Sequence, residues 1–312
     1  MPGKDLLSVA DLTSDDIQKL INAAGALKKG ESTGALHDKE LGLLFEKPSL
    51  RTRVSFEIAM RQLGGNALYL SPAEVGLGQR EAIADVARVL SRYLNGLAVR
   101  TFSQHTLEVL ANNATIPVIN ALSDREHPCQ ALADLLTIQE KKGNLAGLTL
   151  AFLGDGNNVA HSLLLACSLV GTGFRIASPP GYRVDENILN HARTHAVESG
   201  AEILCTEDPR EAVSGADVVY TDVWTSMGQE TEAKQRRRVF AAYQVNEELL
   251  SHARPDAILM HPLPAHRGEE VSPDILDGPQ SVVFDQAENR LHLQKALLLR
   301  MLGDKNPAGI KS

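Results

Sequence analysis

The sequence predicts an α/β protein of two domains, each a mostly parallel sheet flanked by helices. Short apolar runs alternate with amphipathic helical periods along the whole chain, which is the pattern of strands joined by crossover helices. A chain of 312 residues, 43% of them hydrophobic and 22% charged, is long enough for two domains of ordinary size. The same rhythm repeats on either side of the stretch 143–147, which begins and ends with glycine. We therefore expect one domain over residues 1–143 and a second over residues 144–312.

Caps and apolar periods predict the elements of the first half. Thr13 or Ser14 is the expected N-cap of a first helix, because Asp15 and Asp16 follow in its first turn, and this helix ends near Gly30. The remaining elements expected here are strands at Leu41–Phe45, Ala67–Leu70, Gly96–Arg100 and Pro117–Asn120, and helices at Val54–Leu63, Glu81–Leu94, His105–Ala111 and from after His127 to about Lys142.

The second half repeats the alternation of strands and helices. The strands expected here are Thr149–Leu153, Phe174–Ala177, Ala201–Cys205, Asp217–Thr221, Ala257–Met260 and Val282–Phe284, with helices between them. A last helix is expected at Glu288–Leu302. We expect this helix to pack back on the first domain.

Composition and charge exclude several classes of protein. The chain has 31 Lys and Arg against 39 Asp and Glu, a net charge of -8, which argues against a general nucleic-acid binder. No run approaches the ~20 apolar residues that cross a bilayer. The first residues resemble neither a secretory signal nor a transit peptide, so we expect a cytoplasmic protein. Three cysteines without C-x-x-C spacing, and ten histidines without H-E-x-x-H, predict neither disulfides nor a metal site.

The segment 45–53 joins a predicted strand to a predicted helix and carries two hydroxyls and two arginines. Ser49–Thr52 should lie at the start of that helix, where unpaired backbone N–H groups and the helix dipole favour an anion. Arg51 and Arg53 add positive charge. The alternative is an N-cap followed by solvated basic residues, and the motif alone does not decide between the two. The segment lacks the Gly-x-x-x-x-Gly-Lys of a P-loop.

A second motif, His127-Pro128-Cys129-Gln130, places a histidine and an amide at one helix start, because proline suits the first turn. The imidazole of His127 could hydrogen-bond a polarised carbonyl oxygen, and Gln130 could accept from an amide N–H. A capping histidine beside a solvated glutamine is the equally compatible alternative.

The stretch Gly154-Asp155-Gly156-Asn157-Asn158 has the strand, the Gly-x-Gly and the helix of a dinucleotide site, but Val159 stands where the third glycine belongs. The next strand ends in Ser-Pro-Pro without an acidic residue for a ribose. A nicotinamide cofactor is therefore not expected, and the two asparagines are left as polar groups at the sheet's ligand-binding edge.

Two further motifs follow predicted strands. Asp222 ends one strand and suits an ammonium group, although an Asx-type turn with Trp224 as a buried anchor is an equal alternative. His261-Pro262-Leu263-Pro264 ends another strand, and its prolines remove donors while leaving carbonyls free to accept. A lone motif of this kind is more often a rigid turn, in some cases with a cis bond.

Together and in this order, these motifs resemble the transcarbamylase family, and within it the ornithine branch. The segments that carry the resemblance are Phe45–Glu57, Val99–Phe102, His127–Gln130, Gly154–Asn158, Asp222–Gly228 and His261–Val271. The resemblance spans nearly the whole chain. It implies an amino-terminal domain that binds carbamoyl phosphate, a carboxy-terminal domain that binds ornithine, a homotrimer with shared active sites, and no cofactor.

The resemblance also implies roles for individual residues. It implies carbamoyl phosphate contacts from Ser49, Leu50, Arg51, Thr52, Arg100, His127, Gln130, Pro262, Leu263 and Arg290. It implies ornithine contacts from Asn158, Asp222, Ser226 and Met227. Catalytic roles fall to Arg51, Arg100, His127, Asp222 and Pro262. In this scheme His127 holds the carbamoyl oxygen and Gln130 the amide.

Three positions depart from the family pattern. Leu50 stands where a threonine is usual, so one hydroxyl contact is lost. Pro262 replaces the cysteine of the ornithine branch and matches the aspartate branch instead. In the loop Ser71–Glu81, which in relatives reaches a neighbouring subunit's site, Gly76 replaces the usual Gln or His, and either Gln79 or Arg80 could supply the contact.

The reaction implied is attack of the neutral δ-amine of ornithine on carbamoyl phosphate, which gives citrulline and phosphate in arginine biosynthesis. Carbamoylation of aspartate or another amine is the nearest alternative, although Asp222 would repel a dicarboxylic substrate. A nicotinamide-dependent oxidoreductase and a non-catalytic binding protein are the more distant alternatives.

Overall fold

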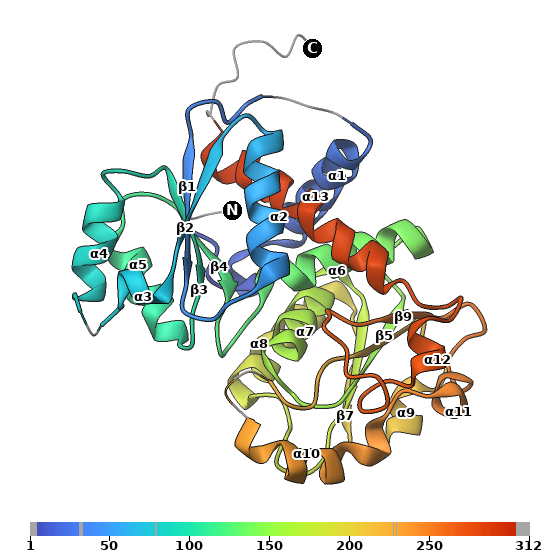
Figure 1. The fold of residues 1–312 in the computed structure, drawn as a ribbon. Coiled ribbons are helices and arrows are strands. Elements are labelled where there is room, and N and C mark those ends of the chain that lie inside the picture. Colours follow the sequence, from blue (N-terminus) through green and yellow to red (C-terminus); the bar gives the residue numbers. More distant parts are fainter. Residues whose placement is uncertain (1–4, 31–33, 79, 227, 229, 304–312) are drawn as a thin grey trace. The chain divides into compact units, whose positions relative to one another are not determined.

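The structure is a computed structural model that describes residues 5–30, 34–78, 80–226, 228 and 230–303. The chain divides into two compact units: unit 1 comprises Met1–Leu136 and Asn289–Ser312, and unit 2 comprises Thr137–Glu288. Both units are layered α/β structures (Figure 1). None of the described helices is long and apolar enough to span a membrane.

Unit 1 contains a parallel sheet of four strands in the order β2-β1-β3-β4. The strands are β1 Glu40–Phe45, β2 Asn66–Leu70, β3 Gly96–Arg100 and β4 Val118–Leu122. Every residue of β3 and β4 is buried, as is typical of parallel strands covered by helices on both faces. The carboxyl ends of all four strands therefore lie at the same edge of the sheet.

Several helices of unit 1 begin at residues whose side chains cap them. They are the 3-10 turn η1 Val9–Asp11, α1 Ser14–Lys28, α2 Leu50–Gln62, α3 Pro72–Val75, α4 Ile83–Leu90 and α5 Gln104–Asn113. Thr13, one of the two N-caps considered from the sequence, caps α1. Its hydroxyl accepts from the Asp16 N–H, and its own N–H donates to the Asp16 carboxylate. Helix α6, Pro128–Lys142, begins in unit 1 and ends in unit 2.

Unit 2 contains a parallel sheet of five strands in the order β7-β6-β5-β8-β9. Its strands are β5 Thr149–Leu153, β6 Gly173–Ala177, β7 Ile203–Thr206, β8 Val218–Thr221 and β9 Ile258–Met260. Its helices are α7 Asn158–Val170, α8 Glu186–Ser199, α9 Pro209–Val213, α10 Ala233–Phe240, α11 Glu247–Leu250 and α12 Pro273–Leu276, with 3-10 turns η2 Glu230–Glu232 and η3 Ala241–Tyr243. The strand order reverses between β5 and β8, which is where open α/β sheets place their ligands.

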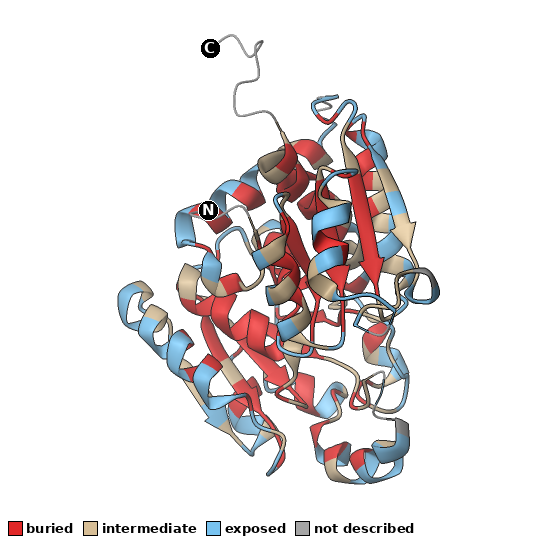
Figure 2. Cartoon of the chain, turned by 90° about the vertical axis from the view of Figure 1, so that its left-hand side faces the viewer, coloured by how far each residue is buried: buried red, intermediate tan, exposed pale blue. Residues whose placement is uncertain are grey.

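Burial follows the layers in both units, with buried strands in the interior and exposed outer faces on the helices (Figure 2). The last helix, α13 Val283–Leu302, supplies core residues to unit 1 from Asn289 onward. There the ammonium of Lys295 bonds the Leu27 carbonyl and the Gln62 amide, and Arg300 pairs with Asp16. The predicted return of the last helix to the first domain is confirmed.

One predicted strand is wrong. The run Val282–Phe284 was expected to be a strand, but Val283 begins α13, five residues before the expected start at Glu288. The chain makes a single bridge to the sheet, Ser281 with Leu259, and then turns into the helix. Val283 is buried and Phe284 is 70% exposed, so this apolar triplet follows a helical turn rather than a sheet face.

Candidate active site

The start of α2 in unit 1 holds the predicted anion-binding segment. Ser49 is the N-cap, because its hydroxyl accepts from the Thr52 backbone N–H at 3.4 Å and donates to the Thr52 hydroxyl at 3.0 Å. The N-cap considered from the sequence is therefore present. Leu50 is 76% exposed and Thr52 is buried. Because Ser49 satisfies only one of the first N–H groups of the helix, the others can still meet an anion.

Two buried arginines lie beside this helix start. The guanidinium of Arg290 on α13 donates to the Thr52 hydroxyl at 2.7 Å, which joins segments far apart in the sequence. Arg100, the last residue of β3, is 7% exposed, and its Nε has no hydrogen-bond partner among the described residues. Burial, with the positive charges of Arg290 and Arg51 acting in the same direction, lowers the pKa of Arg100 to about 10. Unit 1 therefore collects three cations at one site.

His127 and Gln130 complete this group at the start of α6. Burial, then the charges of Arg290 and Arg100, lower the pKa of His127 well below its usual value, so the imidazole is neutral at physiological pH. The amide nitrogen of Gln130 donates to Asp134 at 2.8 Å, while its buried oxygen has no hydrogen-bond partner in the described part of the chain. This oxygen is therefore available to accept a hydrogen bond from an N–H donor.

Unit 2 places a second polar group where the strand order reverses. Asp222 follows β8, and its carboxylate accepts from the Asn157 amide at 2.8 Å and from the Val223 backbone N–H at 2.8 Å. Burial raises the pKa of Asp222, while His261, Asn157 and Val223 act in the opposite direction. Asn157 also caps α7 through its side-chain oxygen. Asn157, one of the two asparagines that the sequence places at this edge, thus bonds Asp222. The ornithine contact expected of Asn158 stays a prediction.

The loop after Asp222 is fixed at its base. Trp224 is buried and stacks on Phe240 with centroids 6.1 Å apart, and its carbonyl accepts from the Nε of Arg236 at 2.5 Å. Arg236 also pairs with Asp155 in the loop after β5. The buried anchor considered for Trp224 is present. Ser226 is partly buried, and Met227 lies outside the described residues.

The His261–Pro264 segment follows β9. His261 and Pro262 are buried, Leu263 has a positive φ of 56°, and the Leu263–Pro264 bond is cis. The backbone N–H of His261 donates to the Gln286 side chain at 2.9 Å. In unit 1, Arg80 is exposed in the loop after α3 and Gly76 has a positive φ, whereas Gln79 lies outside the described residues.

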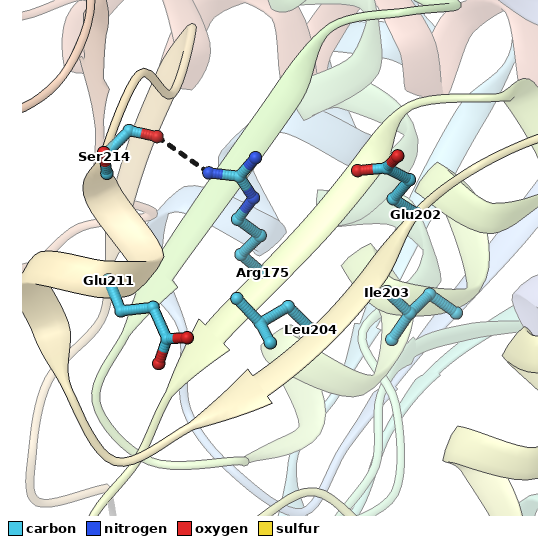
Figure 3. Close-up of a pocket in the computed structure, with 6 residues that line it drawn as sticks. All are labelled: Arg175, Glu202, Ile203, Leu204, Glu211 and Ser214. Carbon is cyan, nitrogen blue, oxygen red and sulfur yellow. Dashed lines mark hydrogen bonds between the residues drawn. The ribbon is translucent and has the colours of Figure 1, made fainter.

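A hollow of about 740 Å³ lies elsewhere on unit 2, and Figure 3 shows its lining. It is lined by Arg175, Glu202, Ile203, Leu204, Glu211 and Ser214. Arg175 is held by the Ser214 carbonyl at 2.7 Å. None of these lining residues belongs to a predicted site motif, so size alone does not locate the chemistry.

One cluster among the described residues has the donor atoms of a metal site: His266, Glu269 and Glu270, with ligand atoms within 4.8 Å of one another. Protein donors hold part of its carboxylates, while the second oxygen of Glu270 is buried without a hydrogen-bond partner among the described residues. Glu269 pairs with Arg237 at 2.9 Å, and one oxygen of Glu270 accepts from two N–H groups.

Comparison with known families covers both units. Residues 4–140 match the carbamoyl-P binding domain of aspartate/ornithine carbamoyltransferase, and residues 146–301 match the Asp/Orn binding domain. The chain belongs to the aspartate/ornithine carbamoyltransferase family. Its fold class and its place in the family, both predicted from the sequence, are thereby confirmed.

Individual family members resemble the chain over nearly its full length. The ornithine carbamoyltransferase of Bacillus subtilis is 55% identical over 300 residues, which is 96% of this chain and 94% of the relative. The anabolic enzyme of Pyrococcus furiosus is 51% identical over 307 residues, covering 97% and 98% of the two chains. A solved structure of the ornithine carbamoyltransferase from the same organism superimposes with a TM-score of 0.94, again covering 97% and 98% of the chains. The anabolic enzyme of Campylobacter jejuni is 40% identical with a TM-score of 0.92, covering 96% and 99%.

Sequence motifs missed several partners within this family fold. Asn157, Asp134, Arg236 and Glu270 each bond a residue at or beside a predicted site position. Only Asn157 carried a local signal, because it stood in the polar stretch after a strand. The others lie one or more helical turns or whole loops away from their partners, and their contacts depend on the folded chain.

Proposed function

We propose that this protein transfers the carbamoyl group of carbamoyl phosphate to the δ-amine of L-ornithine, which gives L-citrulline and phosphate in arginine biosynthesis. The observation that carries the proposal is the cluster of Arg51, Arg100 and Arg290 beside the start of α2, with a neutral His127 next to it. Relatives at 50% identity and above are named ornithine carbamoyltransferases, which supports ornithine as the acceptor.

Unit 1 is proposed to bind carbamoyl phosphate. The contacts come from Ser49, Leu50, Arg51, Thr52, Arg100, His127, Gln130 and Arg290, together with the Pro262 and Leu263 carbonyls of unit 2. The cations and the first N–H groups of α2 neutralise the phosphate. Because leaving phosphate gains negative charge as the C–O bond breaks, these groups stabilise the transition state more than the ground state.

His127 is proposed to donate a hydrogen bond to the carbamoyl oxygen. Since its pKa is lowered, the ring stays neutral and does not add a fourth cation to the site. As the amine attacks, the carbonyl oxygen becomes an oxyanion, and the imidazole N–H, with Arg51 and Arg100, stabilises that charge. The free oxygen of Gln130 accepts from the carbamoyl amide and orients the carbon for attack. No protein nucleophile is required.

Unit 2 is proposed to bind ornithine through Asn158, Asp222, Ser226 and Met227. The carboxylate of Asp222 would hold the α-ammonium group, and that positive charge replaces the solvent which burial removes from the carboxylate. Pro262 is proposed to act through its carbonyl, which can accept from the attacking amine. The proposed catalytic groups are therefore Arg51, Arg100, His127, Asp222 and Pro262.

The test is citrulline formation from carbamoyl phosphate at pH 8, with ornithine, aspartate, putrescine and acetylornithine offered in parallel. We expect activity with ornithine alone. Pro262 favours aspartate as a second candidate, because the aspartate branch has proline at this position, so carbamoylation of aspartate would replace the proposal. Turnover by none of the four amines would favour a binding protein that kept the carbamoyl phosphate site.

We further propose a cytoplasmic homotrimer with shared active sites, in which residues 1–143 form the carbamoyl phosphate-binding domain and residues 144–312 the ornithine-binding domain. Large apolar side chains on unit 1 are exposed in the single chain: Leu50, Val54, Leu68, Val89 and Tyr93. Exposed apolar groups of this kind support self-association. Light scattering on the purified protein tests the assembly, with a monomer as the result that would refute it.

A further inference from the structure

A buried histidine lies at the start of the segment that carries the proposed Pro262 carbonyl. His261 follows β9 and is fully buried. Its Nδ1 lies 2.9 Å from the Leu263 backbone nitrogen, and its Nε2 lies 3.1 Å from the carboxylate of Glu270. A backbone N–H can only donate, so Nδ1 must be the acceptor, and the ring proton must be on Nε2, facing the carboxylate. The two contacts therefore specify one tautomer of the ring.

Glu270 fixes the other end of this arrangement. It is fully buried, and one carboxylate oxygen accepts from His261 Nε2 and from the His266 backbone N–H at 2.6 Å. Its own carbonyl accepts from the Val245 backbone N–H at 2.9 Å, which ties it to another loop of unit 2. The two donors from His261 and His266 hold this carboxylate oxygen in place. Glu270 thus fixes the orientation of the His261 ring through its Nε2 atom.

Peptide geometry carries that orientation to Pro262. The Pro262 carbonyl and the Leu263 N–H belong to one planar trans peptide, so they point in opposite directions. A bond that directs the Leu263 N–H at His261 therefore directs the Pro262 carbonyl away from the histidine. Leu263 also has a positive φ, which a leucine avoids without external contacts, and the bond to His261 is one such contact.

We propose that Glu270 and His261 are positioning residues, which aim the Pro262 carbonyl at the amine that attacks carbamoyl phosphate. The inference rests on the proposed function, because it assigns that carbonyl to the reacting amine. Neither side chain touches a reacting atom: Glu270 acts on His261, and His261 acts on the backbone. A small rotation of this peptide misplaces the acceptor, and misplacement of about 1 Å can cost about 10²-fold in rate.

Two substitutions of His261 separate the two contacts. In His261→Asn the side-chain oxygen can take the place of Nδ1 and accept from the Leu263 N–H, but nothing reaches Glu270. In His261→Gln the amide nitrogen can take the place of Nε2 and donate to Glu270, but no acceptor remains for Leu263. We expect His261→Gln to lower kcat with ornithine by about 10- to 100-fold. The loss of kcat in His261→Asn should be several-fold smaller than this.

Thermal stability should show the opposite order. His261→Asn removes a donor from the buried Glu270 carboxylate and should melt at the lower temperature, whereas His261→Gln keeps that bond. A merely structural role would make activity follow stability, so equal losses, or losses in the order of the melting temperatures, would overturn the proposal. Inhibition by inorganic phosphate should be unchanged in both variants, because phosphate is assigned to unit 1. His252→Gln, an exposed histidine of the same unit, is the matched control.

A direct measurement does not depend on turnover. Nitrogen chemical shifts of ¹⁵N-histidine-labelled protein distinguish the two neutral tautomers, and the His261 signals are assigned by their absence in His261→Asn. We expect the Nε2–H tautomer at pH 8. An Nδ1–H tautomer or a charged ring would overturn the proposed positioning of the Pro262 carbonyl by Glu270 and His261. If the wild type fails to carbamoylate ornithine, the proposed function fails, and the tautomer still tests the orientation of the peptide.

Discussion

Replacing Arg100 by methionine should make the ligand-free protein more stable and the ligand site much weaker. Arg100 is buried at the end of β3, and its charge lies beside those of Arg290 and Arg51. Methionine has a similar length and no charge. The substitution therefore removes an unfavourable charge from the empty site and a favourable one from the occupied site.

The pKa gives the size of the first effect. Folding lowers the guanidinium pKa from its ordinary value to about 10, and each pKa unit corresponds to about 1.4 kcal/mol, so the charge costs about 3 kcal/mol in the folded state. For a base whose pKa is lowered by folding, the unfolded chain binds the proton more tightly. The cost is therefore fully present below pH 10, and it disappears only as the pH rises above that value.

Phosphate titrations by thermal melting measure both effects at pH 7.5. Without phosphate, we expect Arg100→Met to melt about 2–5 °C above the wild type, since 312 residues give about 0.7 kcal/mol per degree at the midpoint. Phosphate at about 100 times its Kd stabilises the wild type by about 2.7 kcal/mol. In the variant, the loss of one or two charge-assisted bonds weakens phosphate about 10²-fold and nearly abolishes this shift.

Turnover should fall in the same variant by about 10² to 10³, the usual effect of removing one oxyanion donor. Arg92→Met, an exposed arginine on the same unit, is the control and should change neither curve. A variant that melts below the wild type without phosphate, or that keeps the wild-type phosphate shift, would refute the electrostatic argument.

Three further outcomes follow from unit 2 and from the proposed chemistry. Arg236→Met should destabilise the protein by about 3–5 kcal/mol and raise the KM for ornithine, because the partly buried Asp155 loses its partner and the Trp224 carbonyl loses its donor. Melting curves and kinetics measure both effects, and an unchanged KM would separate this contact from ornithine binding. Asp222→Asn should raise the KM for ornithine at least tenfold and leave inhibition by phosphate unchanged. In the wild type this KM should rise as the pH falls, because burial raises the pKa of Asp222 and protonation removes the charge that holds the ammonium group. A KM that stays constant from pH 9 to 6 would argue against this role of Asp222. Prolonged EDTA treatment should leave kcat within experimental error, and a loss restored by a divalent cation would point to the His266, Glu269 and Glu270 cluster.

The sequence predicted the strands of both sheets because their burial is encoded locally. A buried parallel strand such as Leu41–Phe45 is a continuous apolar run between polar breaks, and each such run is present at or near its expected residues. The run Val282–Phe284 has the same local composition, yet it begins a helix. Whether this run forms a strand or a helix depends on the helical apolar period that follows it as far as Leu302. The three residues alone do not contain that period.

The sequence indicates candidate site positions for a related reason, whereas it does not indicate most of their hydrogen-bond partners. Arg100 is the last residue of the apolar strand β3, Asp222 directly follows β8, and parallel topology brings such residues to one edge of each sheet. Pairs such as Thr52 with Arg290 join positions 238 residues apart. No spacing rule connects these positions, because their contact is made by the return of α13 to unit 1.

Pro262 illustrates how a departure from the family pattern can leave the proposed chemistry intact. If the group that meets the substrate is the carbonyl, any residue at this position supplies it, and the cysteine thiol of relatives is not needed. Proline differs in lacking an N–H, so the fold cannot use a donor at this position. In this structure the aiming bond comes from the N–H of Leu263 instead, one peptide further along, and the side chain at 262 is free to vary without changing the direction of its own carbonyl.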